Sequence, residues 1–198
     1  MIARFPLFVL GLVGSMTAVL SSMAMAQSAE FKCPKPGTVA DASDGSSTTW
    51  NSQDRNFCKR QVRSAVGEER AEYWYAPTFE MPANRSQRCA EQLKPWALWP
   101  LTVGRKLTEQ CDVLVARGDN SYVRFYTITI DAYEKLSTKA GTFDTFVVTR
   151  VTVPIHQYPV RATLRIWYAP DPGVVVKSTY IAASQGTNST QEATAIRQ

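Results

Sequence analysis

The chain has 198 residues, of which 44% are hydrophobic and 20% are charged, and its net charge at pH 7 is +5. This length suits one folded domain with a sizeable hydrophobic core. The basic excess is mild and lacks the clustering of Lys and Arg that nucleic-acid-binding proteins usually show. Nucleic acid is therefore not an expected partner.

Residues 1–26 have the pattern of a secretory signal peptide. Arg4 supplies the basic start, Phe5–Leu20 is an uncharged apolar stretch, and Ala24-Met25-Ala26 resembles a signal-peptidase site. The alternative is a membrane anchor, but the apolar stretch is shorter than the roughly 20 residues that a membrane span needs. We expect cleavage before Gln27, a soluble periplasmic or secreted protein without a transmembrane span, and one antiparallel β domain over residues 27–198.

The four cysteines, Cys33, Cys58, Cys89 and Cys111, all follow the predicted signal peptide. An even number of cysteines in an exported protein predicts two disulfides. A zinc site is not expected, because no C-x-x-C pair occurs and His156 is the single histidine. Three pairings are possible, and we prefer Cys33–Cys58 with Cys89–Cys111 because each closes the shorter loop.

Two hairpins are expected in the first part of the domain. One has Gly37–Ala42 and Ser47–Ser52 around the Asp-Gly turn at Ser43-Asp44-Gly45. The other has Arg55–Ser64 and Arg70–Ala76, with its turn at Val66-Gly67-Glu68.

Charged residues in the second hairpin follow the strand period. Arg55, Lys59 and Arg63 alternate onto one face of the first arm, and Cys58 and Val62 share the other face, which indicates a half-buried strand. An acidic run follows in the turn and the second arm. A local run of this kind is normally a solvated face, and this reading covers Glu68, Glu69 and Glu72.

Prolines break the middle of the chain into a long connection. A short helix is predicted over Ser86–Lys94, since Ser86 can cap it and Pro95 ends it. Trp96 and Trp99 follow in a segment too rich in proline for a helix or a central strand. We expect these large rings to plug one end of the core, and a ligand site is the alternative. Strand character resumes over Val103–Ala116.

Four successive strands are predicted after this connection, because β-branched and aromatic residues dominate and turn residues separate them. A shorter strand over Thr190–Ile196 is expected at the edge of the sheet. Helical periodicity is scarce, so the fold class is mainly β, a single curved antiparallel sheet or half-barrel with one short helix. The four strands are Tyr122–Ile130, Thr142–Val153, Val160–Ala169 and Val174–Ile181.

Three segments in this region form a familiar order: Trp99–Gly104, Ala140–Phe146 and Trp167–Lys177. On these segments, residues 99 to 180 resemble a group of bacterial exported proteins sometimes labelled TapB-like. That group is similar in turn to the curved half-barrels of the lipoprotein carriers LolA and LolB. The resemblance implies a fold and no functional residue, and carriage of lipid is an analogy of shape.

The strand Val160–Ala169 carries the candidate ligand-binding residues. Leu164 lies on an apolar face with Val160, Ala162, Ile166 and Tyr168, while Arg161, Arg165 and Trp167 lie on the other face. Charges on neighbouring central strands, Arg124, Arg150 and Lys177, extend these arginines into a possible basic stripe. The alternative is that these cations line a solvated outer face, with their stems covering neighbouring side chains.

Catalysis is not expected, because His156 lies on a proline-bounded connection with no serine, cysteine or carboxylate adjacent to it. No cofactor or metal is predicted. Two functions remain. The first is a non-enzymatic periplasmic binding or carrier module for a lipid or an anionic envelope polymer. The second is an accessory subunit that pairs its sheet edge or tryptophan segment with another envelope protein.

The signal-peptide pattern leads to a prediction about processing. The exported protein should begin at Gln27 and carry no acyl chain on Cys33, because Ala29-Glu30-Phe31-Lys32 before that cysteine is not a lipobox. Intact mass spectrometry of protein from the periplasm measures both properties. A mass that retains residues 1–26, or an acyl adduct on Cys33, would contradict the prediction.

Overall fold

The computed structural model describes residues 27–82, 94–114, 121–155, 161–182 and 185–198. The predicted signal peptide and the predicted helix before Pro95 therefore lie outside the described residues, apart from Lys94. No helix among the described residues is long and apolar enough to cross a membrane.

The described chain is mainly strands, as predicted, with one short 3-10 helix, η1 (Pro95–Leu98). Two short strands, β1 and β7, pair with each other, and the other eleven form one antiparallel sheet. The strands are β1 (Ser28–Ala29), β2 (Val39–Ala42), β3 (Ser47–Gln53), β4 (Cys58–Arg63), β5 (Glu69–Ala76), β6 (Phe79–Pro82), β7 (Leu101–Thr102), β8 (Lys106–Leu114), β9 (Ser121–Thr138), β10 (Gly141–Ile155), β11 (Ala162–Ala169), β12 (Val174–Ala182) and β13 (Thr187–Arg197).

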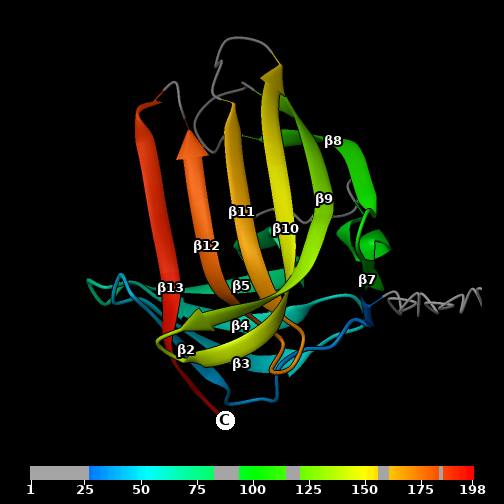
Figure 1. Cartoon of the computed structure of the whole chain (residues 1–198). Helices are drawn as coiled ribbons and strands as arrows, with labels where there is room; N and C mark the ends of the chain where they lie inside the picture. Colours follow the sequence, from blue (N-terminus) through cyan, green and yellow to red (C-terminus); the bar gives the residue numbers. More distant parts are fainter. Residues whose placement is uncertain (1–26, 83–93, 115–120, 156–160, 183–184) are drawn as a thin grey trace, which may run out of the picture.

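The large sheet consists of two meanders joined by β13. The strand order is β6-β5-β4-β3-β2-β13-β12-β11-β10-β9-β8. We call β2–β6 the first half-sheet and β8–β12 the second half-sheet. Figure 1 shows the second half-sheet upright, with β2–β5 running across its lower end. The sheet thus curls at β13 and is not closed, because its end strands β6 and β8 do not pair with each other.

The position of β13 corrects the prediction of an edge strand. β13 pairs with β12 through Thr187–Glu192 and with β2 through Ala193–Arg197, with an irregularity between Ala193 and Ala195. Its polar first half reads as an exposed edge, because five of its first residues are solvent-exposed even in the folded sheet. Consecutive residues alternate between the two faces of a strand, so neither face of this half of β13 is covered and polar residues fit an interior strand here.

Alternation along the strands builds an aromatic core between the two half-sheets. Trp50 and Trp74 come from the first half-sheet, Tyr168 from the second, and each is less than a tenth exposed. The rings of Trp74 and Tyr168 are stacked with their centroids 5.7 Å apart. Buried aromatic rings contribute large apolar areas, so this contact holds the two half-sheets together.

The segment that carries Trp96 and Trp99 packs against the core, as predicted. η1 lies against both β5 and β8, and Leu98 is fully buried. The Trp99 ring meets Tyr168 edge-on at 5.8 Å, and its Nε1 donates to the Tyr75 carbonyl oxygen at 3.1 Å. Arg105 holds the segment by donating to the carbonyl oxygens of Leu98 and Pro100.

One predicted disulfide is confirmed. Cys33 and Cys58 are bonded across a sequence separation of 25, which ties the extended segment before β2 to β4. The second predicted pair cannot be followed, because Cys89 lies outside the described residues.

The β9–β10 hairpin is longer than predicted, because β9 continues to Thr138 instead of ending at Ile130. A bulge at Asp131 of β9, which lies between the partners of Val147 and Val148, bends the hairpin, and Figure 1 shows its far half crossing the lower ends of β11 and β12. The turn reaches β13, where Ala140 N–H donates to the Ala193 carbonyl oxygen at 3.3 Å. The residues after Ile130 are largely polar and contain no long apolar run, so the sequence did not predict this extension.

Tyr168 provides a test of the core. Its hydroxyl is buried and has no hydrogen-bond partner within the described part of the chain, and burial raises the pKa of this hydroxyl above its ordinary value. Tyr168→Phe should therefore raise the free energy of unfolding by about 1 kcal/mol, since an unsatisfied polar group leaves the core. Tyr168→Ala should lower it by about 3–5 kcal/mol.

Urea unfolding followed by tryptophan fluorescence measures both variants. A clear loss of stability in Tyr168→Phe would show that the hydroxyl has a partner and would contradict this account of the core.

Candidate functional site

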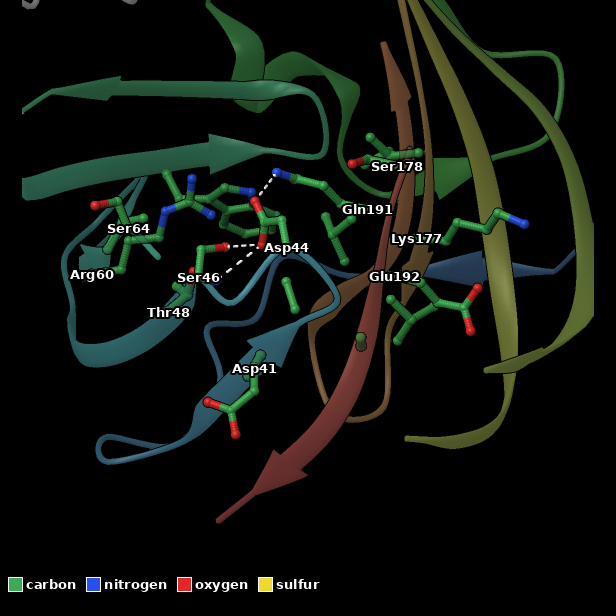
Figure 2. Close-up of a pocket in the computed structure, with 18 of the residues that line it drawn as sticks. Asp41, Asp44, Ser46, Thr48, Arg60, Ser64, Lys177, Ser178, Gln191 and Glu192 are labelled. Carbon is green, nitrogen blue, oxygen red and sulfur yellow. Dashed lines mark hydrogen bonds between the residues drawn. The ribbon is translucent and has the colours of Figure 1, made fainter. Parts of the chain in front are cut away.

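A groove of about 400 Å³ lies on the concave side of the sheet, where the two half-sheets meet at β13. Its walls come from both half-sheets and from β13 itself. Figure 2 shows Asp44, Ser46, Thr48, Arg60 and Ser64 on one side of this space and Ser178 and Gln191 on the other.

The floor of the groove is apolar and continues the core. Leu164 and Ile166 of β11 and Val176 of β12 line it from the second half-sheet, and Trp74 of β5 lines it from the first. Opposed residues of an antiparallel pair share a face, so Ile166 brings its partner Ser178 into the same wall. The floor can therefore accept an apolar group beside hydroxyl-bearing side chains.

Asp44 is held at the β13 side of the groove. Its Oδ1 accepts from the backbone N–H and the hydroxyl of Ser46, at 3.0 and 2.7 Å, and its Oδ2 accepts from Gln191 Nε2 at 2.5 Å. Burial opposes ionisation, but these hydrogen bonds outweigh it and lower the pKa of Asp44 below its ordinary value of 3.8. Asp44 is therefore ionised at neutral pH, with both oxygens occupied.

Two arginines of the first half-sheet line the groove and are joined by a buried glutamate. Glu72 Oε2 accepts from Arg60 Nη2 and Nε at 2.6 and 2.9 Å, and Glu72 Oε1 accepts from Arg70 Nε at 2.7 Å. The Arg60 guanidinium also lies 5.4 Å from the centre of the Trp50 ring. We call Arg60, Arg70 and Glu72 the arginine cluster.

The burial of Glu72 corrects the prediction that the acidic run is a solvated face. Glu69 is exposed, but the Glu72 side chain is only 3% exposed. Burial alone would raise the pKa of Glu72, and the charges and hydrogen bonds of Arg60 and Arg70 lower it below its ordinary value of 4.5. Glu72 lies two residues before Trp74 on β5, so its side chain points to the same buried face in spite of its charge.

Thr78 lies at another part of the groove wall, in the turn between β5 and β6. Its φ of 71° is unusual for a β-branched residue and marks a strained turn. The Thr78 carbonyl oxygen accepts from Arg150 Nη1 of β10, and the Arg150 guanidinium lies 5.7 Å from the Tyr126 ring centre. The hydrogen bond from Arg150 to Thr78 therefore links the two half-sheets beside the groove.

The structure separates the residues predicted to bind a ligand. Leu164 lines the groove, but Arg165 and Trp167 lie on the outer face of β11, with Arg165 exposed. Arg165 and Lys177 flank the Trp167 ring at 5.2 and 5.3 Å, and Trp167 Nε1 donates to Glu134 at 2.7 Å.

The predicted basic stripe is not continuous. Arg150 opposes Leu164 in the register and so faces the concave side, whereas Arg165 opposes Thr149 on the outer side. Arg161 is exposed just before β11 begins, and the side chain of Arg124 is outside the described part. Lys177 contributes to the groove wall, but Figure 2 shows its ammonium end directed away from Asp44 and Arg60.

The arginine cluster was missed in the sequence, although a signal for it exists. Arg60 has the same strand phase as Cys58 and Val62, which were assigned to the buried face of this arm. A charged residue on a buried face needs a partner of opposite charge. Glu72 has that role, since it opposes Arg60 in the register of β4 and β5. Among the described residues, no three His, Cys, Asp or Glu side chains gather as metal ligands.

Comparisons with known proteins place few limits on function. No protein-family model matches the chain, and no curated protein matches it significantly. A solved structure from Bacteroides fragilis, described as an exported protein with a YmcC-like fold, is 12% identical with a TM-score of 0.43. A structure from Parabacteroides distasonis, described as a lipoprotein, is 13% identical with a TM-score of 0.41. Each match covers 86% of this chain and 100% of the other.

Both likenesses are loose, and neither description mentions a TapB-like or Lol-type protein. The TapB-like resemblance therefore stays a prediction.

The low pKa of Glu72 leads to a prediction about acid stability. A carboxylate with a depressed folded-state pKa stabilises the protein above its unfolded-state pKa, and this contribution disappears as the pH falls through the folded-state value. Glu72→Gln should lower the free energy of unfolding by about 2 kcal/mol at pH 7 and by much less at pH 3. Urea unfolding at the two pH values measures this difference.

Glu69→Gln on the same strand is the control, because Glu69 is exposed and its substitution should change stability little at either pH. An equal loss for Glu72→Gln at pH 7 and pH 3 would show that its charge does not stabilise the fold.

Proposed function

We propose that this protein is a non-enzymatic binding or carrier module outside the cytoplasm, and that it holds a lipid or an anionic envelope component in the groove at β13. The observation that carries this proposal is the composition of the groove, whose floor is apolar and whose walls hold hydroxyl, carboxylate and guanidinium groups. Its volume of about 400 Å³ falls in the range of small-molecule sites.

An amphipathic ligand matches both parts of this groove. An apolar chain against Leu164, the partly exposed residue of this floor, gains about 0.8 kcal/mol for each buried methylene. Polar groups of the same ligand can remain at the open walls, where Ser178 and Thr48 offer hydroxyls. The Cys33–Cys58 disulfide supports an oxidising compartment such as the periplasm.

An accessory subunit is the second candidate, and the open sheet favours it. β6 and β8 end the sheet without pairing with each other, and most side chains of β8 from Lys106 to Gln110 are exposed. An unpaired edge strand can add a strand from another protein. Native mass spectrometry of the protein from the periplasm separates the two functions, since a bound small ligand supports the first and a bound protein supports the second.

Filling the groove tests the first function. Ser178→Phe places a ring against the apolar floor and should weaken the binding of dodecyl phosphate at least tenfold, because the ring occupies the space of the chain. Thr179→Phe is the matched control, since Thr179 is the next residue of β12 and faces the outer side opposite Arg165. It should bind like the wild type.

Isothermal titration calorimetry with dodecyl phosphate and with neutral dodecyl maltoside measures binding, and thermal unfolding shows that both variants fold. If the wild type binds neither amphiphile, the binding function is wrong and the accessory subunit is favoured. Equal weakening by Ser178→Phe and Thr179→Phe would place the bound amphiphile elsewhere.

A further inference from the structure

We infer that the arginine cluster is a head-group site, which binds the phosphate or carboxylate of an amphipathic ligand whose chain lies on the apolar floor. This inference rests on the proposed function and adds the orientation and the charge of the ligand. The anionic end points to β4 and β5, and the apolar end points to β11 and β12.

Arg60 is a fixed donor at this site. Its side chain is 14% exposed, two of its nitrogens donate to Glu72 Oε2, and its guanidinium lies over the Trp50 ring. These contacts restrict the rotamers of a long side chain before any ligand binds. Because Arg60 also lines the groove, little side-chain entropy remains to be lost when an anion meets it.

Arg70 is a more exposed donor beside it. The Arg70 side chain is 65% exposed and contacts Glu72 through Nε. This arrangement directs one edge of the guanidinium to Glu72 and leaves most of the side chain open to solvent along the groove. Guanidinium groups bind phosphate and carboxylate through paired, charge-assisted hydrogen bonds.

The arginine cluster by itself favours an anion. Two guanidinium groups surround one carboxylate, so the cluster keeps one net positive charge. Arg60 and Arg70 line the groove, whereas Glu72 is buried behind them and does not line it. A ligand in the groove therefore meets the arginines before the carboxylate.

Three other acids line the groove, and their orientation preserves this preference. Figure 2 shows Asp41 and Glu192 pointing away from the space beside Arg60. Asp41 is also paired with Arg197. Asp44 faces the groove, with its oxygens occupied by Ser46 and Gln191. Asp44 should oppose the anion weakly, so Asp44→Asn should strengthen anion binding by a small factor.

The decisive variant is Arg70→Gln, because Arg70 is exposed and Glu72 keeps Arg60 when it is replaced. We expect dodecyl phosphate and dodecanoate to bind about fivefold more weakly to this variant, the factor being modest because the site is partly solvated. Neutral dodecyl maltoside should bind unchanged. Arg63→Gln is the matched control, since it removes the same charge from an exposed residue on the outer face of β4.

Calorimetric titrations at low and high salt measure these affinities. In the wild type, the preference for the anionic amphiphiles over dodecyl maltoside should shrink as salt rises. Retention of part of the affinity in Arg70→Lys would support a role for its charge, and a larger effect on dodecyl phosphate than on dodecanoate would identify phosphate as the favoured head group.

The outcomes distinguish this inference from the proposed function. If dodecyl maltoside binds in the groove but Arg70→Gln and Arg63→Gln bind the anions like the wild type, the head-group site is wrong and the binding function stands. If no amphiphile binds the wild type, both are wrong. If Arg70→Gln fails to fold, the salt titrations of the wild type decide. A preference for the anionic amphiphiles that stays the same at low and high salt would overturn the inference.

Discussion

The fold depends on one strand whose two halves pair with different neighbours. β13 uses its first half to pair with β12 and its second half to pair with β2. Every other neighbouring pair in the large sheet joins strands that follow each other in the sequence. Without β13, the two meanders would each be a short sheet with one apolar face exposed. The aromatic core forms because β13 holds these two faces opposite each other.

The groove follows from a gradient of side-chain size across the concave face. Large rings fill the space where Trp74, Trp99 and Tyr168 meet. Beside β13 the facing residues are small, and Ala40, Ala42 and Ala193 leave room between the half-sheets. The arginine cluster lies where these regions adjoin, which explains how a charged group can be held firmly next to an open space. Glu72 is buried on the core side of the cluster, and the side that faces solvent is open to a ligand.

Sequence periodicity and turn residues predicted the mainly β fold and both early hairpins, because these features depend on neighbouring residues. The Cys33–Cys58 disulfide was predicted from the even number of cysteines and the shorter loop. It did not predict the place of β13, since the pairing of β13 with β2 depends on the whole curled sheet and not on its own residues. The candidate site shows the same division. Leu164 was found from alternation within one strand, whereas Arg60 and Glu72 become a site only when two strands are in register. The placement of Arg165 on the outer face also follows the predicted alternation. Its role in ligand binding stays a prediction.

The two-way pairing of β13 also has a consequence for the order of assembly. The Cys33–Cys58 bond and the β2–β6 meander lie in the first part of the chain, so this half can be crosslinked independently of the later strands. The contact of Thr194 with Asp41 spans 153 residues, and contacts so distant in sequence form slowly. We therefore expect an intermediate with a formed first half and an unjoined second half. In that intermediate both edges next to the future β13 are open, so this is the stage at which the chain most needs protection from aggregation.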